Sequence, residues 1–120
     1  MNRTGPTNPE LKELILELRK VSYTEKAKIW KRIADDLEKP TRNRRAVNIN
    51  RINQHTKKNE IIVVPGKVLG TGNLDHNITI AAFSFSEGAK KIITDAKSKA
   101  ITIEELLKKN PKGKDIRIIG

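Results

Sequence analysis

Residues 78–93 read ITIAAFSFSEGAKKII and join a strand pattern to a helix pattern. The run from Ile78 to Phe85 is mostly apolar, with β-branched and aromatic side chains, which is typical of a buried strand. Ser86 stands where a helix N-cap is preferred, and apolar residues then recur at helical spacing from Ala89 to Ala96. This stretch therefore predicts a strand that leads directly into a helix.

A second strand is predicted upstream of this unit. Ile61 to Val64 is an apolar, β-branched run, and we expect Pro65-Gly66 to close it. Before it, Val47, Ile49 and Ile52 nearly alternate with polar residues, which indicates a short strand or a strand-to-helix transition.

Downstream, the pattern predicts a short helix and a last strand. Thr102 and Glu105 have capping-box spacing, and the helix that they open is expected to stop at Asn110-Pro111. The run from Ile116 to Ile119 then indicates a terminal strand. Because strands and helices alternate from about Val47 onward, the fold class is expected to be α/β.

The first forty residues predict two helices that form an antiparallel hairpin. Asn8-Pro9 has the order of an N-cap and a first helical residue, and helical spacing continues to about Lys20. Ser22 and Glu25 have capping-box spacing and predict the start of the second helix, which ends before Pro40. The expected apolar faces are Leu11, Leu14, Ile15 and Leu18 in the first helix and Ala27, Trp30, Ile33, Ala34 and Leu37 in the second.

A chain of 120 residues has the size of one ordinary domain. We expect one compact domain overall with two parts. Residues 1–45 are predicted to hold an N-terminal extension, the helical hairpin and a basic linker, and residues 46–120 the α/β core.

The composition excludes several classes of protein. The formal net charge is +11, and an excess of this size implies an anionic partner. The chain has no cysteine, which excludes disulfides and thiolate metal sites, and four aromatic residues argue against a large stacking platform. Its longest apolar runs are too short to span a membrane, so we expect a soluble, cytoplasmic protein.

The glycine-rich stretch from Pro65 to Leu74 does not match a nucleotide-binding loop. Gly66-Lys67 is followed by Val68 rather than by the Ser or Thr that holds magnesium in a Walker A loop. Asp75 stands where a dinucleotide fingerprint needs its third glycine. Two compatible interpretations remain: a tight connection between two strands, or backbone freedom that lets a bulky partner approach and turns amides toward phosphates. The glycines concerned are Gly66, Gly70 and Gly72.

Catalytic and metal-binding patterns are also missing. His55 and His76 have no second ligand at metal spacing, so we expect both to be surface or hydrogen-bonded histidines. Asp35-Asp36 and Glu104-Glu105 are adjacent acids, which point to different faces of a helix and do not flank one substrate bond. No cofactor, metal or small-molecule substrate is expected.

The basic surplus is densest between Thr41 and Asn59, a segment without any acid. Lysine and arginine gain free energy when they displace counterions from a polyphosphate, so nucleic acid is the leading partner, ahead of a membrane surface. Asparagines lie between the basic residues and supply neutral donors for ribose and bases, although they also suit turns and caps. The basic residues of the segment are Arg42, Arg44, Arg45, Arg51, Lys57 and Lys58.

Two rival functions stay open at this point. A DNA-binding module would use Ser22 to Leu37 as its recognition helix, but Glu25, Asp35 and Asp36 lie among the basic residues there. A small enzyme would use the glycine-rich stretch to bind a nucleotide.

The sequence resembles the L-eighteen-e family of large-subunit ribosomal proteins, from the superfamily that includes bacterial L-fifteen. The resemblance covers essentially the whole chain in order, and its most specific block is Val64 to Gly70, which reads VPGKVLG. The other matching patches are Leu37 to Pro40 with Arg44, Val47 to Ile49, Gly72, Ala81 to Phe83, Phe85-Ser86 with Ala89, Asn110 to Gly113, and Ile116 to Ile118. The chain departs from the family at Asp95 to Lys99, where a small glycine turn is common.

The resemblance implies a structural, non-catalytic component of the large (50S) subunit, with a mixed α/β core of irregular strand and helix turns. It implies binding to the large (23S-type) rRNA and contact with neighbouring large-subunit proteins; the short length suggests the archaeal form. Combined with the charge pattern, it predicts rRNA contacts at Arg3, Arg42, Arg44, Arg45, Asn48, Arg51, Lys57, Lys58 and Lys67, and a second contact at Lys112, Lys114 and Arg117. Gly66, Gly70 and Gly72 are predicted to allow close backbone approach to RNA.

Overall fold

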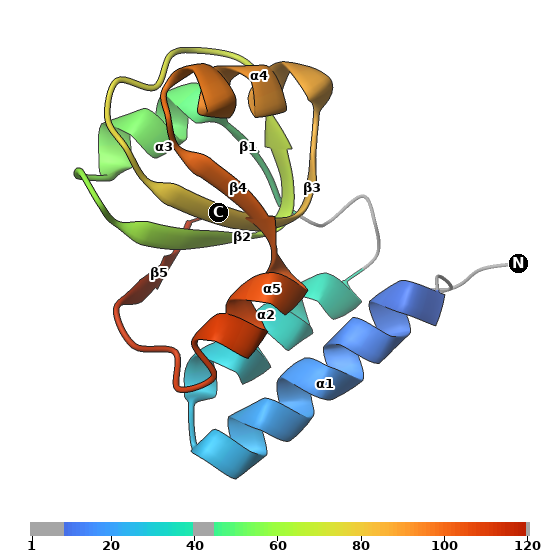
Figure 1. Ribbon diagram of the computed structural model, residues 1–120. Helices are drawn as coiled ribbons and strands as arrows, with labels where there is room; N and C mark the ends of the chain where they lie inside the picture. The colour runs from blue at the N-terminus through green and yellow to red at the C-terminus, as the bar shows by residue number, and fades with distance from the viewer. Residues whose placement is uncertain (1–8, 40–44, 120) are drawn as a thin grey trace, which may run out of the picture.

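The computed structural model describes residues 9–39 and 45–119, and within these ranges five parallel strands form one sheet (Figure 1). The strand order is β1-β2-β3-β4, and β5 pairs with β2. The strands are β1 Arg45–Asn48, β2 Ile61–Leu69, β3 Thr79–Phe85, β4 Lys99–Thr102 and β5 Ile116–Ile118. The predicted α/β class is confirmed.

The long strand β2 shares one of its edges between two partners. Its start, from Ile61 to Val63, pairs with β5, and its end, from Gly66 to Leu69, pairs with β1. Pro65, which has no amide hydrogen to donate, falls in the gap between these partners. The register against β3 also shifts between Val64 and Lys67, so the extra residue there is a bulge. The expectation that Pro65-Gly66 closes the strand is therefore wrong, because the bulge accommodates both residues and β2 continues to Leu69.

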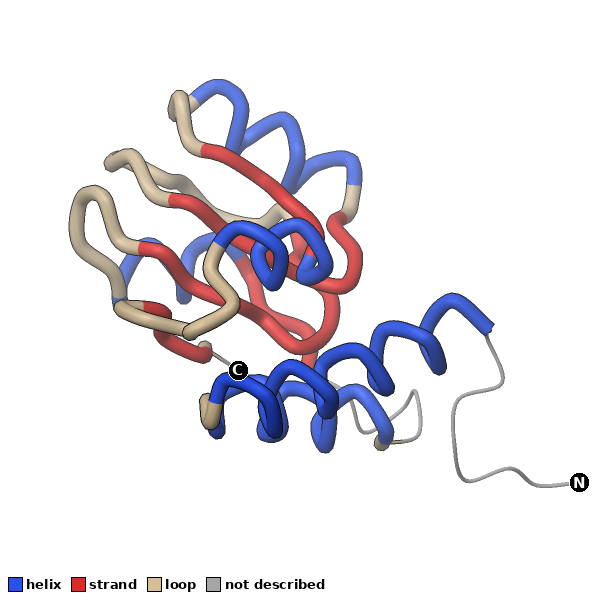
Figure 2. The backbone as a smooth tube through the Cα atoms, turned by 60° about the horizontal axis from the view of Figure 1, so that its bottom comes forward, coloured by secondary structure: helices blue, strands red, loops and turns tan. Residues whose placement is uncertain are grey.

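The connections place helices on both faces of the sheet (Figure 2). Helices α3 (Ile49–His55) and α4 (Glu87–Asp95) follow β1 and β3 and share one apolar cluster. Helix α5 (Ile103–Lys109) follows β4, and its chain returns across the sheet to β5 on the far side of β2. Parallel crossovers are right-handed, so this reversed direction requires the opposite face. Accordingly α5 belongs to the other apolar cluster.

The helical hairpin covers the same face as α5. Helix α1 (Pro9–Glu25) runs five residues further than expected, and α2 (Lys28–Glu38) begins three residues after Glu25. The predicted capping box at Ser22 and Glu25 is wrong, because Ser22 lies inside the last turn of α1 and its carbonyl accepts the amide of Ala27. Lys26 has a φ of +56° and makes the turn. The predicted cap Asn8 lies outside the described residues.

Two apolar clusters hold the layers together. One joins the hairpin and α5 to Val63 and Ala81, and it buries Trp30 completely. The other joins α3 and α4 to the opposite face of the sheet through residues such as Ile62 and Ile80. Along β2, consecutive residues therefore serve different clusters, as the alternation of side chains in a strand requires. The predicted apolar faces of both hairpin helices are confirmed, with Leu14 half-buried.

The helix caps predicted after the strands are present. Ser86 Oγ accepts the amide of Ala89 at 3.1 Å. Thr102 and Glu105 form the full capping box, with bonds of 3.0 and 2.9 Å. Strand β4 is not predicted by the sequence. It is four residues long and lies at one edge of the sheet, and all its residues are exposed except half-buried Ile101. Such an edge lacks the apolar run that predicts a strand.

Candidate nucleic-acid interface

The acid-free segment runs through β1, α3 and the loop that follows. Arg42 and Arg44, together with the predicted contact Arg3, lie outside the described residues. Arg45 begins β1 and pairs with Gly66 of β2. The described part of the segment therefore begins beside the middle of β2, and β1 runs along β2 to the carboxyl ends of both strands.

A polar and basic area lies where β1 and β2 end. Val47 and Val68 are buried beneath α3 and α4, so their strand neighbours face the other side of the sheet. Those neighbours, Ala46 and Lys67, are exposed and directly paired in register. The hairpin thus leaves this half of the face open to solvent. We use the name sheet-end surface for the exposed residues at this end of the sheet, namely Ala46, Asn48 and Lys67 on the open face and Arg51 on the helix that follows β1.

Helix α3 follows β1 directly and packs on the opposite face of the sheet, so Arg51 in its first turn lies at the same end of the sheet but not on the face of Ala46 and Lys67. Ile49 and Ile52 are completely buried and fix the helix against the sheet, whereas Arg51 lies on the exposed side. Asn48 occupies the N-cap position of α3, but its side chain makes no capping hydrogen bond. Asn53 behaves differently, because its Oδ1 accepts the amide of Asp75 at 3.1 Å. The asparagines of this segment therefore divide: Asn53 supports a loop, while Asn48 stays exposed.

The glycines near this surface are held by packing within the chain. A Cβ on Gly70 would lie 2.4 Å from the backbone of Gly88 and Ala89, so the loop touches the start of α4 directly. Gly72 has a φ of +111°, and a Cβ there would lie 2.3 Å from the Cβ of Asn50. The amide of Asn50 also donates to the carbonyl of Thr71 at 3.0 Å. Close backbone approach is present, and in the structure the approaching groups are α3 and α4.

Gly66 has a different role from the other two. It is buried within β2 at the bulge, and neither it nor Gly70 is among the positive-φ glycines. Gly70 and Gly72 do lie in a connection between two strands, residues 70–78, but it is a longer loop between the parallel strands β2 and β3 rather than a tight turn. Contact of these glycines with RNA stays a prediction.

Arg117 lies with the loop after α3 rather than with Lys112 and Lys114. Its guanidinium donates to the Glu60 carboxylate at 3.0 Å and to the carbonyl of His55 at 2.6 Å. Glu60 also accepts the amide of Lys57 at 2.6 Å. Arg117 is thus tied to the loop that carries the exposed Lys57 and Lys58, and its charge is matched by Glu60.

A second basic area forms between the hairpin turn and the loop after α5. Trp30 Nε1 donates to the carbonyl of Pro111 at 2.7 Å, and a Cβ on Gly113 would lie 2.6 Å from Ile29. These contacts bring the two segments together, and Asn110 fixes the loop through two bonds to the backbone of Lys114. The exposed lysines of this loop corner are Lys26, Lys28, Lys112 and Lys114.

Lys26 and Lys28 are not among the predicted contacts. The sequence offers no direct signal for their position beside Lys112 and Lys114. The single clue is Trp30, a large residue with one hydrogen to donate, which usually finds a partner when buried.

The histidine and the acids behave as structural groups. His76 makes hydrogen bonds of 2.8 Å with Asp75 and 2.7 Å with Thr56, as expected for a hydrogen-bonded histidine. The bond to His76 lowers the pKa of the Asp75 carboxyl below its ordinary value. Residues 9–39 and 45–119 contain no cluster of His, Asp or Glu that could hold a metal ion.

The adjacent acids of α2 separate as expected. Asp35 pairs with Arg19 at 3.2 Å and with Lys31 at 3.3 Å, whereas Asp36 pairs with Lys39 at 3.2 Å. Arg19 also donates to Glu38 at 2.7 Å. The hydrogen bond from Arg19 lowers the pKa of Glu38. For Asp35, partial burial acts in the opposite direction, but the bonds from Arg19 and Lys31 outweigh it, and the pKa is lowered.

Helix α2 is also a poor recognition helix for DNA. Its apolar face is buried against the sheet, and Ser22 belongs to α1. Its outer face carries acids that are already paired with cations. Nor do the described helices include one that is long and apolar enough to cross a membrane.

Comparison with known proteins gives consistent matches over nearly the full chain. The family described as ribosomal protein 60S L18 and 50S L18e matches residues 3–120. A large ribosomal subunit protein eL18 from Methanoregula boonei is 53% identical over 120 residues, covering 99% of each chain. The eL18 of Methanothermobacter thermautotrophicus is 50% identical, covering 94% of this chain and 93% of its own, and that of Methanococcus maripaludis is 44% identical over all of both chains.

Proposed function

The chain belongs to the family of ribosomal proteins 60S L18 and 50S L18e, and from that premise we propose that it binds the large (23S-type) rRNA as a structural component of the large ribosomal subunit. Members of this family are not enzymes. The chain works in translation within the cytoplasmic ribosome, beside rRNA and other large-subunit proteins.

The sheet-end surface is the observation that carries the rRNA-binding proposal. Arg51 and Lys67 are exposed there, and no ion pair holds either residue within the described part of the chain. Residues 41–59 around them contain no acid. Cations without an internal partner are the groups that gain most when they displace counterions from phosphates. Exposed Asn48 beside them supplies a donor and an acceptor for ribose hydroxyls.

Several further contacts belong to the same proposal. Residues 46–120 form the RNA-binding core; the N-terminal extension adds Arg3 to the contact, and the basic linker that ends residues 1–45 adds Arg42, Arg44 and Arg45. Lys57 and Lys58 lie on the loop after α3, and Arg117 orders that loop through Glu60. Lys112 and Lys114 form a second contact, to which the loop corner adds Lys26 and Lys28.

The salt dependence of rRNA binding tests the proposal. Affinity for a large-subunit rRNA fragment is measured over a range of salt concentrations, and log K is expected to fall by roughly 0.7–0.9 per neutralised phosphate per decade of salt. Duplex DNA of equal charge is the competitor, and it is expected to displace the rRNA poorly. A flat salt dependence, or equal competition by duplex DNA, would contradict the proposal.

A further inference from the structure

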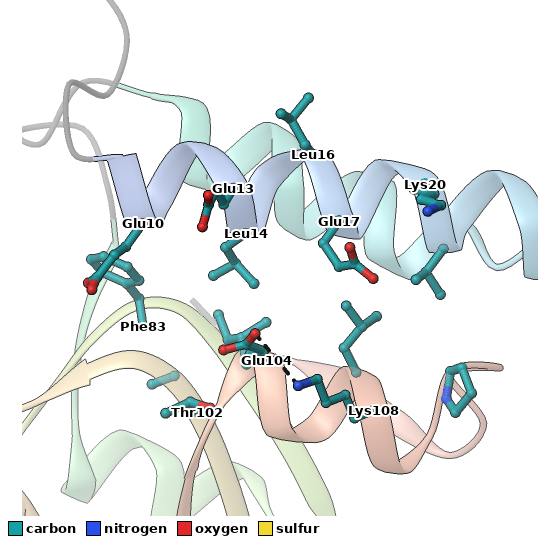
Figure 3. Close-up of a pocket in the computed structure, with 15 residues that line it drawn as sticks. Glu10, Glu13, Leu14, Leu16, Glu17, Lys20, Phe83, Thr102, Glu104 and Lys108 are labelled. Atoms are coloured by element: carbon teal, nitrogen blue, oxygen red, sulfur yellow. Dashed lines mark ion pairs between the residues drawn. The ribbon is translucent and has the colours of Figure 1, made fainter.

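A groove between α1 and α5 is lined by residues of both helices and by Pro111 of the loop after α5. It has a volume of about 990 Å³, and Phe83 of β3 lies at one end of it, beside Glu10 (Figure 3). Its apolar lining includes Leu14 and Val21 of α1 and Ile103 and Leu107 of α5. The α1–α5 groove therefore offers an apolar lining to a partner.

The rim of this groove is acidic, in contrast to the molecule as a whole. Glu10, Glu13 and Glu17 line it from α1, and Glu104 lines it from α5. Lys20 and Lys108 also line it, so four acids face two bases in a chain whose net charge is +11. Figure 3 shows Glu17 directed from α1 toward α5, and Glu104 paired with Lys108 on α5.

Two acids of the groove, Glu13 and Glu17, are matched less well than the acids of α2. Spacings of three and four residues place the glutamates of α1 on one face of the helix, where like charges repel each other. Neither Glu13 nor Glu17 has an ion pair among the residues that the structure describes. In α2, by contrast, Asp35 and Glu38 both pair with Arg19. Within the described residues, no ion pair therefore offsets the repulsion between Glu13 and Glu17.

We infer that the α1–α5 groove binds an extended, lysine- and arginine-rich segment of another protein, with apolar residues between its charges. The carboxylates of the rim pair with guanidinium and ammonium groups, and the apolar lining takes leucine-like side chains and the aliphatic stems of the basic ones. Polyphosphates are repelled by the same carboxylates. That the partner is a neighbouring large-subunit protein rests on the proposed function; the chemistry of the groove does not.

A labelled peptide tests the groove directly. Helix α1 has 17 residues and is about 25 Å long, which an extended peptide of roughly eight residues matches. The probe is a fluorescent peptide of that length with alternating basic and small or apolar residues, and binding is measured by anisotropy at physiological salt, where the Debye length is about 8 Å. We expect saturable binding despite the net positive charge of the protein. A peptide with glutamate in place of each basic residue is expected not to bind.

Matched variants locate the binding. The double variant Glu13→Gln/Glu17→Gln is expected to weaken peptide binding roughly five- to tenfold, as the loss of two weakly screened charge pairs implies. The control Glu25→Gln/Asp95→Asn removes the same charge from exposed sites outside the groove and is expected to change binding less than twofold. Absence of peptide binding, equal binding of the acidic peptide, or equal losses in both variants would each overturn the inference.

Variants separate the groove from the rRNA surface. Arg51→Gln/Lys67→Gln is expected to keep the peptide affinity within twofold of the wild type, and Glu13→Gln/Glu17→Gln is expected to keep the rRNA affinity. Loss of peptide binding in the Arg51→Gln/Lys67→Gln protein, or self-association of the chain through the groove in sedimentation, would overturn the inference. If the chain ignores rRNA yet binds the peptide, the proposed function fails and the groove assignment stands.

Discussion

The helical hairpin and the sheet-end surface differ in whether their basic side chains are paired with acids. Residues 9–39 hold eight basic and seven acidic side chains, and Arg19, Lys31 and Lys39 are matched by acids of α2. Residues 45–59 hold four basic side chains and no acid. Three cations of the hairpin are therefore neutralised within the fold, whereas the segment through β1 and α3 contains no acid of its own. The placement of acids, more than the number of cations, distinguishes the two regions.

The largest expected effect concerns Gly70, which follows β2 directly and packs against α4. Gly70→Ala places a Cβ 2.4 Å from the α4 backbone and is expected to lower the free energy of unfolding by about 1–3 kcal/mol. Gly88→Ala on the other side of the same contact meets its nearest atom at 3.7 Å and is expected to be tolerated. Urea denaturation measures both. A stable Gly70→Ala protein that has lost rRNA affinity would show that Gly70 serves RNA instead.

The second prediction removes two cations of the sheet-end surface that form no ion pair with the described residues. Arg51→Gln/Lys67→Gln is expected to reduce rRNA affinity roughly tenfold and to lower the salt slope by about 1.4–1.8, because two phosphates lose their partners. Filter binding at several salt concentrations gives both values. The matched control Arg19→Gln/Lys31→Gln removes the same charge from the hairpin. If the control weakens rRNA binding as much, total charge rather than its location governs binding.

The third prediction concerns the paired charge of the hairpin. Arg19→Gln is expected to cost at most about 1 kcal/mol of stability, since its pairs with Asp35 and Glu38 are largely exposed. Its rRNA affinity is expected to stay within twofold of the wild type. Thermal denaturation at low and high salt checks the first part, because screening should reduce the difference. An Arg19→Gln protein that is fully stable but binds rRNA poorly would place Arg19 in the interface.

The smallest expected effect is the pH dependence of the same pairs. The pKa values of Asp35 and Glu38 are lowered in the folded chain, so their stabilisation is complete above the ordinary values of 3.8 and 4.5 and is lost as the pH falls through the lowered values. The stability difference between wild type and Arg19→Gln should therefore shrink on acidification below about pH 4.5. A difference that grows in acid would contradict this assignment.

The sequence predicted those parts of the fold that local signals determine. Caps such as Ser86, and the buried β-branched strands, depend on residues within one turn or one strand, and both are present. The capping box predicted at Ser22 and Glu25 is wrong because both residues also fit the interior of a helix. The predicted end of β2 at Pro65-Gly66 is wrong because a bulge depends on which strands pair with β2. Strand β4 is not predicted because an edge strand buries few apolar side chains.

The candidate site was less predictable for a related reason. The absence of acids between residues 41 and 59 is visible in the sequence and identifies the sheet end. The pairing of Arg117 with Glu60, by contrast, spans 57 positions and depends on β5 lying beside β2. The loop corner likewise depends on Trp30 reaching the carbonyl of Pro111. Long-range packing of this kind leaves no pattern in a single chain.

The most direct test of the central claim is the salt slope of rRNA binding for the wild type and for two charge-matched variants, Arg51→Gln/Lys67→Gln at the sheet end and Arg19→Gln/Lys31→Gln on the hairpin. The slope of log K against log salt concentration is expected to be the same for the wild type and the hairpin variant. For the sheet-end variant its magnitude is expected to be smaller by about 1.4–1.8. Identical slopes for all three proteins, each shown to be folded, would contradict the account.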